Sequence, residues 1–148
     1  MEELNFDVVV VGGGPAGSSA ARIAAENECT VALVEKEKEI AETVRTSGVT
    51  WISDIKKFKI PEDCYNSIKK FSFCSPKNSV TISDNVAKAA VLDVRKTYRF
   101  LANRAQSSGA KIFTSTNVSE VLKNSDGKCV GVIAKSKDKH IQFNAKVI

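Results

Sequence analysis

The clearest pattern near the start of the chain is an unbroken apolar run within residues 6–11, which ends in three consecutive glycines. A short β-branched run of this kind is typical of a strand that is buried on both faces of a parallel sheet. Small, helix-forming residues follow over residues 18–26, and a second apolar run occupies residues 30–34. The pattern therefore predicts a βαβ unit over residues 1–37.

The middle of the chain has a weaker pattern. Residues 38–90 contain few long periodic segments, and Pro61 and Pro76 interrupt them. We expect this stretch to be an irregular excursion. After it, apolar residues recur at helical spacing over residues 95–107, and Ser108-Gly109 is a favourable end for such a helix. A short strand over residues 111–114 should return to the parallel sheet.

Alternating apolar positions dominate the last thirty residues. Two such runs, residues 118–123 and 129–135, flank the turn sequence Asn124–Gly127, which predicts a β-hairpin. Residues 141–143 can supply a third strand of a meander, and residues 145–148 should begin another strand of the sheet. Residues 91–148 thus read as a helix, a strand and an antiparallel meander.

The loop after the first strand carries the most informative chemistry. Gly12 permits a tight turn, Gly14 lets backbone amides approach an anion, and Gly17 allows close packing of the helix on the strand. The helix N-terminus, with its unpaired amides and its dipole, would then face a pyrophosphate. Glu35 lies at the end of the second strand, where a carboxylate can accept hydrogen bonds from an adenosine ribose and disfavours a 2′-phosphate.

A glycine pattern alone is a weak indication, since many glycine-rich turns bind nothing. Here a strand precedes it, a helix follows it, and an acidic residue stands at the right distance. Together these conditions favour dinucleotide binding, although Glu35 could also be a solvated carboxylate. The residues of this part that we predict to bind the cofactor are Gly12, Gly14, Pro15, Ala16, Gly17, Glu35 and Lys36.

The sequence from Val9 to Ala21 resembles the N-terminal FAD-binding segment of flavoprotein monooxygenases and their relatives. Further pieces, from residues 44–53 to residues 91–110, look like the geranylgeranyl reductase family of FAD-dependent enzymes. The resemblance implies an oxidoreductase that uses FAD to reduce isoprenoid double bonds of lipid precursors. The family usually has a glycine in the turn that ends the first helix, where this chain has Glu28 beside Asn27; we expect Asn27 to take the left-handed conformation there.

The same resemblance implies further cofactor contacts. Arg45 matches an arginine that lies along the FAD, Arg95 matches one that opens a helix near the phosphate and ribose, and Val118 follows the strand where backbone atoms contact adenine. Surface salt bridges are the alternative for both arginines. Many members have a cysteine where this chain has Thr46, which argues against a thiol mechanism there. Trp51 and Tyr65 are candidates for lining the substrate cavity, or else for packing.

The resemblance also predicts the fold class. It is an α/β fold with a Rossmann-like βαβ domain of the glutathione-reductase/hydroxylase type, a parallel sheet and an antiparallel β-meander. Residues 1–148 would be the N-terminal part of an FAD-binding domain that is incomplete at its C-terminus, with the substrate domain absent. We therefore expect a fragment, a truncated gene or half of a split enzyme, and no catalytic residue can be named.

Several alternatives stay open at this stage. An FAD-dependent aromatic hydroxylase or monooxygenase shares the motifs loosely, a flavin halogenase fits less well, and a truncated, non-catalytic nucleotide-binding module belongs to another class. An NAD dehydrogenase is disfavoured by the spelling Gly14-Pro15-Ala16-Gly17. The substrate would be an isoprenoid or lipid. The electron donor could be a nicotinamide, a deazaflavin or ferredoxin.

The composition of the chain limits the ligands, the metal sites and the cellular location that we expect. The formal net charge of +5 comes from scattered lysines, which favours anionic ligands or an anionic membrane face but makes no nucleic-acid arm. The four cysteines have no C-x-x-C spacing, so we expect no metal site. Acidic Glu2 and Glu3 argue against a signal peptide, and no segment reaches the ~20 apolar residues of a membrane span. We expect a cytoplasmic protein, with contact to a membrane surface left open.

Overall fold

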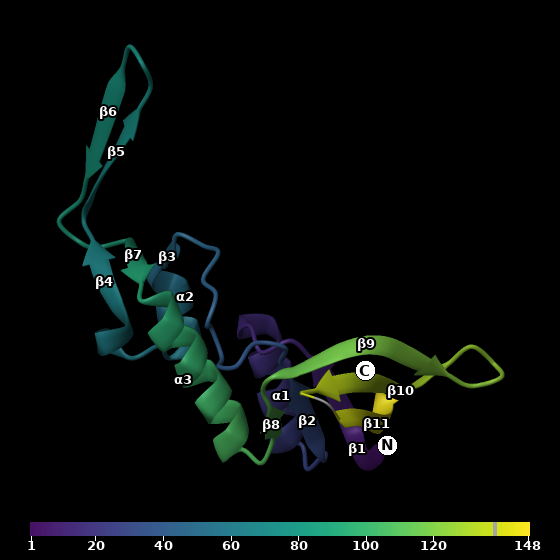
Figure 1. Ribbon diagram of the computed structural model, residues 1–148. Helices are drawn as coiled ribbons and strands as arrows, with labels where there is room; N and C mark the ends of the chain where they lie inside the picture. Colours follow the sequence, from purple (N-terminus) through teal and green to yellow (C-terminus); the bar gives the residue numbers. More distant parts are fainter. Residues whose placement is uncertain (138) are drawn as a thin grey trace. The chain divides into compact units, whose positions relative to one another are not determined.

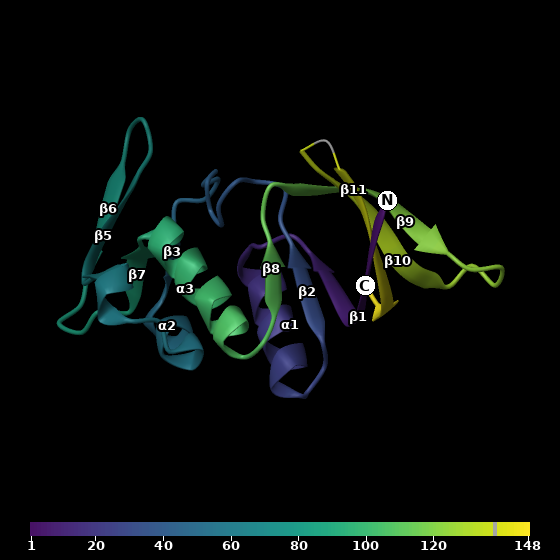
Figure 2. The same ribbon diagram turned by 60° about the horizontal axis from the view of Figure 1, so that its bottom comes forward.

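The computed structural model describes residues 1–137 and 139–148, and these fall into two compact units. Unit 1 comprises residues 1–43 and 98–148, and unit 2 comprises residues 44–97. Figures 1 and 2 show the elements of each unit in two views.

Unit 1 is built on a six-stranded sheet with the order β8-β2-β1-β11-β10-β9. Its strands are β1 (Glu2–Val11), β2 (Val31–Val34), β8 (Lys111–Phe113), β9 (Thr116–Lys123), β10 (Cys129–Ser136) and β11 (Lys139–Val147). Strands β8, β2, β1 and β11 run parallel to one another, and β11 then forms an antiparallel meander with β10 and β9. The predicted α/β fold with a parallel sheet and a meander is confirmed.

Helix α1 (Pro15–Glu26) follows β1 and packs on β1 and β2. Within β2, Val31 and Leu33 point to a core cluster shared with Ala21 of this helix, whereas Ala32 and Val34 point to the opposite cluster around Phe143. All four residues of β2 are buried. A strand covered on both faces must be apolar at every position, which is why it appears as a continuous apolar run in the sequence.

The core cluster around Phe143 contains three aromatic rings that pack on one another. Phe113 meets Phe6 and Phe143 edge to face, with centroid separations of 6.0 and 5.0 Å. Next to Phe6 in β1, Asp7 accepts hydrogen bonds from the backbone N–H and hydroxyl of Thr30 and pairs with Lys146 at 2.7 Å. The Lys146 ammonium is the main reason why the pKa of Asp7 lies well below its usual range. This network joins β1, the start of β2 and the end of β11.

The structure corrects the expectation of two separate strands at the end of the chain. Residues 141–143 and 145–147 belong to one strand, β11, which pairs antiparallel with β10 on one side and parallel with β1 on the other. Its residues 141–145 are at least half-buried. One strand can serve both neighbours because it has two hydrogen-bonding edges.

Unit 2 corrects the expectation of an irregular excursion. It contains a three-stranded antiparallel sheet in the order β3-β7-β4 and a separate hairpin of β5 and β6. The elements are β3 (Val49–Trp51), helix α2 (Ile52–Phe58), the 3-10 turn η1 (Glu62–Cys64), β4 (Tyr65–Ile68), β5 (Lys70–Cys74), β6 (Ser79–Ser83) and β7 (Ala89–Leu92). Helix α3 (Val94–Ser107) begins in this unit and continues into unit 1, and it confirms the predicted helix.

The end of α1 differs from the expected turn. Asn27 has φ −99° and caps the helix, and the residue in the left-handed region is Glu28, with φ 64°. The Asn27 side chain donates a hydrogen bond to the carbonyl of Ile23 at 2.8 Å. The turn predicted for Asn27 is therefore formed one residue later, by a side chain that disfavours this conformation.

Replacing Glu28 by glycine should relieve this strain. We expect the free energy of unfolding to rise by about 1 kcal/mol, because a non-glycine residue in the left-handed region costs roughly that amount. Urea denaturation would measure the change. Asn27→Gly is the matched control, since Asn27 has no positive φ and would lose its bond to Ile23. A Glu28→Gly protein no more stable than the parent would contradict the argument.

Candidate cofactor-binding site

The loop between β1 and α1 makes a tight turn that needs glycine at its first position. Gly12 has φ +102°, which L side chains rarely adopt. Its N–H donates a hydrogen bond to the carbonyl of Val34 at 2.8 Å, so the loop is fixed to the end of β2. The turn directs the chain from the carboxyl end of β1 straight into the first turn of α1.

Gly17 lies where α1 packs closely against the end of β1 and the loop that follows it. A Cβ added to Gly17 would overlap the carbonyl oxygen of Gly12 and would lie 3.2 Å from the Cγ1 of Val10. The first obstacle is backbone, which cannot move aside as a flexible side chain can. The close approach predicted for Gly17 is thus present in the structure.

Gly14 faces open space, in contrast to Gly17. It precedes α1 with φ −70°, and a Cβ built on it would meet nothing within 4 Å. No side chain caps this helix, its first turn has no acidic residue, and Pro15 occupies the first helical position. The helix N-terminus therefore offers its backbone dipole to an anion that approaches past Gly14.

Gly13 has a role that the glycine pattern did not predict. It is buried, and a Cβ there would overlap the Cδ1 of Ile40 and lie 3.2 Å from the Oε2 of Glu35. Its carbonyl accepts a hydrogen bond from the hydroxyl of buried Ser18 at 3.2 Å. The sequence feature that could have revealed this is that Gly13, the middle glycine of an unbroken run of three, stands at a position where the motif allows any residue.

Glu35 is held by four hydrogen bonds, one of which comes from the glycine loop. Its Oε2 accepts from the N–H of Gly13 at 2.7 Å and its Oε1 accepts from the N–H of Glu37 at 2.9 Å. The Glu35 backbone bonds to the carbonyl of Phe113 and to the N–H of Thr116. The half-buried carboxylate thus lies beside the glycine loop, as the sequence predicted, and its remaining lone pairs can accept further hydrogen bonds.

The other residues of unit 1 that were predicted to bind the cofactor lie in β9, in the first turn of α1 and directly after Glu35. Lys36 is exposed directly after Glu35, and Pro15 and Ala16 form the exposed first turn of α1. Val118 is half-buried in β9, opposite Ala134, and packs on the core cluster of Phe143. Their contacts with a cofactor stay predictions.

Arg45 and Arg95 belong to unit 2 and are both exposed. Arg95 lies in the first turn of α3, as expected for a residue that opens this helix. Trp51 ends β3 with 61% of its surface exposed, and half-buried Tyr65 begins β4 opposite Leu92. Cofactor binding by the two arginines stays a prediction.

Within residues 1–137 and 139–148, no three His, Cys, Asp or Glu side chains come together in a way that could hold a metal ion. In the same part of the chain, none of the helices has the length and apolar character needed to cross a bilayer.

Comparison with known proteins points to one family. Residues 7–148 match the model of the FAD dependent oxidoreductase family. A digeranylgeranylglycerophospholipid reductase from Methanocaldococcus jannaschii is 36% identical over 132 residues, which cover 85% of this chain and 33% of that protein. A second one, from Methanocella arvoryzae, is 33% identical over 97% of this chain and 38% of its own length. The chain thus spans little more than a third of these relatives.

Solved structures agree with the sequence relatives. A geranylgeranyl bacteriochlorophyll reductase-like protein from Thermoplasma acidophilum has a TM-score of 0.88 and 27% identity, over 98% of this chain and 38% of its own. A flavin-dependent brominase has a TM-score of 0.77 at 22% identity, over 97% of this chain and 37% of its own, which shows the shared fold alone. The predicted resemblance to the geranylgeranyl reductase family is confirmed.

The residues present fit the cofactor that this family uses. The open space at Gly14 and the uncapped helix behind it suit a diphosphate, and the Glu35 carboxylate stands beside them for a ribose. FAD contains both groups. On the family match over residues 7–148 and on this geometry, the chain belongs to the FAD dependent oxidoreductase family.

Proposed function

We propose that this chain forms the ADP-binding part of the FAD site in an enzyme that reduces isoprenoid double bonds of lipid precursors. The observation that carries the proposal is the placement of the Glu35 carboxylate 2.7 Å from the N–H of Gly13, beside an uncapped helix N-terminus. The substrate class is supported by the names of the relatives, which are reductases of a digeranylgeranyl lipid.

The chain's own residues would bind and orient the cofactor. Backbone amides at the start of α1 hold the diphosphate, and Glu35 accepts hydrogen bonds from the ribose hydroxyls. Arg45 and Arg95 would add paired hydrogen bonds to phosphate or ribityl oxygens, and Val118 would contact the adenine. FAD, when bound, supplies the hydride chemistry that amino-acid side chains lack.

The finer assignments belong to the same proposal. The reaction needs a reductant, which we propose to be a nicotinamide, a deazaflavin or ferredoxin. A lipid substrate is consistent with work at a membrane surface, where the net charge of +5 would favour anionic lipids.

Calorimetric titration of the purified chain with nucleotides tests the cofactor half of the proposal. We expect ADP and FAD to bind, 2′-phospho-ADP to bind at least tenfold more weakly, and inorganic pyrophosphate to compete with ADP. The weaker binding follows from the repulsion between Glu35 and a 2′-phosphate. Equal affinity for ADP and 2′-phospho-ADP would contradict the role of Glu35.

The reductase half needs a separate measurement. The chain would be fused to the part of the M. jannaschii reductase that follows the matched region, loaded with FAD, reduced chemically and given a digeranylgeranyl lipid. Mass spectrometry should detect products with added hydrogen pairs. A folded, FAD-loaded fusion that leaves the lipid unchanged while the natural reductase converts it would contradict the proposal.

A further inference from the structure

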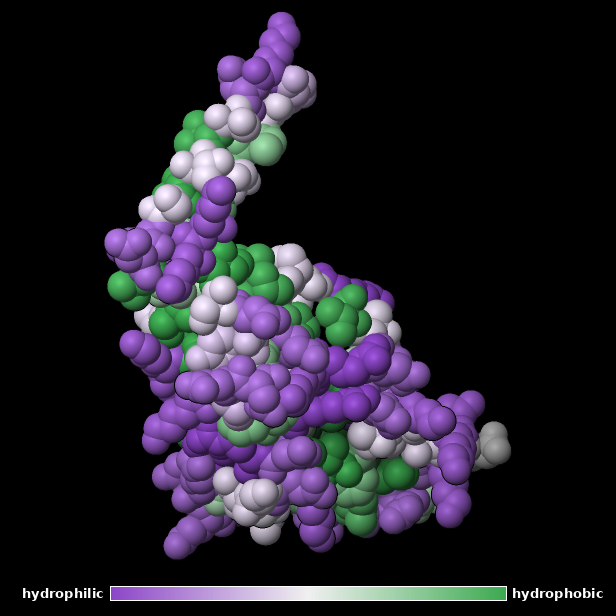
Figure 3. Space-filling model, turned by 90° about the vertical axis from the view of Figure 1, so that its left-hand side faces the viewer, coloured by the Kyte–Doolittle hydropathy of each residue, from purple (hydrophilic) through white to green (hydrophobic). Residues whose placement is uncertain are grey.

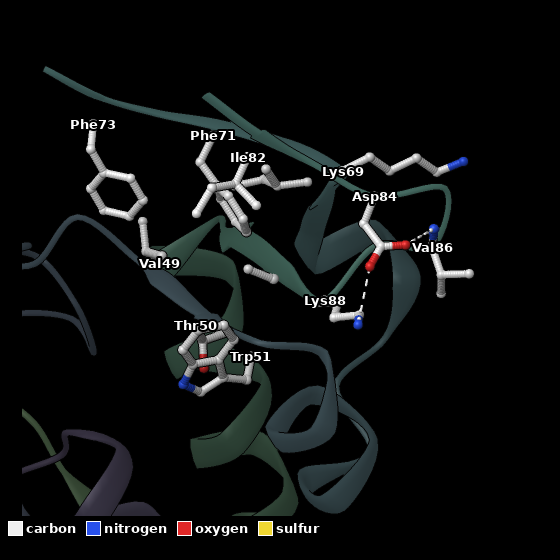
Figure 4. Close-up of a pocket in the computed structure, with 12 residues that line it drawn as sticks. Val49, Thr50, Trp51, Lys69, Phe71, Phe73, Ile82, Asp84, Val86 and Lys88 are labelled. Atoms are coloured by element: carbon white, nitrogen blue, oxygen red, sulfur yellow. Dashed lines mark hydrogen bonds and ion pairs between the residues drawn. The ribbon is translucent and has the colours of Figure 1, made fainter. Parts of the chain in front are cut away.

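Unit 2 contains a cavity of about 540 Å³ between its small sheet and the β5–β6 hairpin (Figure 4). Trp51 lies on the cavity wall, as the sequence predicted for the substrate cavity. Figure 3 shows apolar surface along the hairpin, where Phe73 and Val80 are 65% and 60% exposed. Substrate binding stays a prediction for this cavity. The ribose end of the cofactor site, in contrast, is formed by residues of unit 1.

The segment that follows β2, residues 36–42, forms a closed turn. The N–H of Glu42 donates a hydrogen bond to the carbonyl of Glu39 at 3.2 Å, and the Oε2 of Glu42 accepts one from the N–H of Lys38 at 2.9 Å. Ala41 lies in the left-handed region, with φ 59°. A non-glycine residue keeps such a conformation only where its surroundings hold it there. The 36–42 turn therefore has a defined shape.

The turn places Ile40 over the hydrogen bond between Gly13 and Glu35. Ile40 is only 8% exposed, and its Cδ1 would overlap a Cβ added to Gly13. The Oε2 of Glu35 lies 3.2 Å from the same Cβ position and accepts the hydrogen bond from the Gly13 N–H. A hydrogen bond is electrostatically stronger where water is kept away from it. The apolar cover of Ile40 thus favours one orientation of the Glu35 carboxylate.

Arg99 of α3 holds the turn at two consecutive residues. Its Nε–H donates a hydrogen bond to the carbonyl of Ile40 at 3.3 Å, and its guanidinium group forms an ion pair with the carboxylate of Glu39. The side chains of this ion pair are 44% and 59% exposed, and exposed ion pairs add little to stability. The main effect of Arg99 is therefore on geometry, because it fixes the backbone of the residue that covers Gly13.

We propose that Arg99 is a positioning residue for the ribose, which acts by holding Ile40 over Gly13 and thereby orients the Glu35 carboxylate. The proposal rests on the proposed function for the identity of the ligand, the ADP part of FAD. A carboxylate that is already oriented loses less conformational freedom when it accepts hydrogen bonds from ribose hydroxyls. The diphosphate would instead meet the backbone amides at the start of α1. Loss of Arg99 should therefore weaken recognition of the ribose and leave that of the diphosphate unchanged.

Amide hydrogen exchange, followed by NMR on the ligand-free chain, tests the positioning step alone. We expect Arg99→Ala to raise the exchange rate of the Gly13 N–H at least tenfold, because Ile40 no longer shields its hydrogen bond. The amides of the buried strand β2 should keep their rates. Arg22→Ala is the matched control, since it removes the arginine of another ion pair, with Glu26 within α1, and should leave the Gly13 rate unchanged.

Calorimetric titration with ADP, 2′-deoxy-ADP and inorganic pyrophosphate tests the effect on the ligand. The parent protein should bind ADP about tenfold more tightly than 2′-deoxy-ADP, because Glu35 accepts a hydrogen bond from the 2′-hydroxyl. In Arg99→Ala we expect ADP to bind about fivefold more weakly and the two other ligands to bind as before, so the preference falls to about twofold. Arg22→Ala should keep the preference of the parent. A role in stability alone would not change this ratio.

A double variant shows whether Arg99 acts through Ile40. Ile40→Ala alone should also weaken ADP about fivefold. If both residues act by the same route, Arg99→Ala together with Ile40→Ala should weaken ADP by less than about tenfold, whereas independent effects would multiply to about 25-fold. A loss of about 25-fold in the double variant would overturn the route through Ile40.

Three further results would overturn the proposal. They are an unchanged Gly13 exchange rate in Arg99→Ala, an unchanged preference for ADP over 2′-deoxy-ADP, and equal losses of affinity for all three ligands. The last result indicates that Arg99 contacts the phosphates itself or that the fold is damaged. A parent protein that binds no ADP would contradict the proposed function instead, and hydrogen exchange would still decide whether Arg99 holds Ile40 over Gly13.

Discussion

A Gly17→Ala protein is expected to lose about 3 kcal/mol of stability or more, and with it the ability to bind ADP. The added methyl group would overlap the Gly12 carbonyl oxygen and press on Val10. Overpacking of a rigid site costs about 1 to 3 kcal/mol, and this site is at the upper end because the obstacle is backbone. Moving α1 away would open its contact with β1 and displace its N-terminus from the loop.

Gly14→Ala is the control that separates stability from binding. Its methyl group meets nothing within 4 Å and its φ of −70° suits alanine, so the midpoint of urea unfolding should hardly change. ADP affinity should nevertheless fall at least tenfold, because the methyl group occupies the space through which the diphosphate approaches the amides. Denaturation and calorimetry on both variants test this. A Gly17→Ala protein as stable as Gly14→Ala would disprove the packing argument.

The sequence predicted unit 1 well because its elements have strong local patterns. The strand of residues 31–34 is buried on both faces and therefore continuous in apolar character, and the hairpin around Asn124–Gly127 has turn residues of a defined type. The prediction of two strands, residues 141–143 and residues 145–148, was wrong for a physical reason. Polar Asn144 interrupts the pattern, yet in the structure it is half-buried beside β1 and accepts a hydrogen bond from Gln142.

Unit 2 was missed because its strands are only three to five residues long and pair mainly within a small sheet. Part of it was nevertheless visible. Residues 71–73 and 80–82 both alternate apolar and polar positions, and Ser75-Pro76-Lys77-Asn78 between them is a turn sequence. The hairpin could have been predicted from that alternation, whereas the cavity depends on tertiary contacts that no local pattern encodes.

In the candidate site too, some features could be predicted from the sequence and others could not. The motif located the glycine loop and Glu35 because the spacing of a βαβ unit fixes them together, and the hydrogen bond from Gly13 to Glu35 shows them adjacent. The burial of Gly13 under Ile40 depends on a residue outside the motif. Arg45 and Arg95 were chosen by resemblance alone, and their roles await the tests of cofactor binding.

Glu35→Gln should lower ADP affinity about tenfold to a hundredfold while leaving most of the stability intact. Hydrogen bonds to a charged group contribute about 1.5 to 3 kcal/mol each, and the amide keeps only one acceptor oxygen. That oxygen can still accept from the N–H of Gly13, which is buried. Glu35→Ala would leave this N–H without its acceptor and should cost about 1 to 3 kcal/mol in addition.

Discrimination between ribose forms gives the sharper measurement. The parent protein should prefer ADP to 2′-phospho-ADP, and Glu35→Gln should bring the two affinities within a few-fold of each other, because the repelled 2′-phosphate no longer meets a carboxylate. Glu37→Gln is the matched control, since it removes a carboxylate two residues further along whose backbone N–H, rather than its side chain, bonds to Glu35. Preserved preference for ADP in Glu35→Gln would place the ribose elsewhere and remove Glu35 from the site.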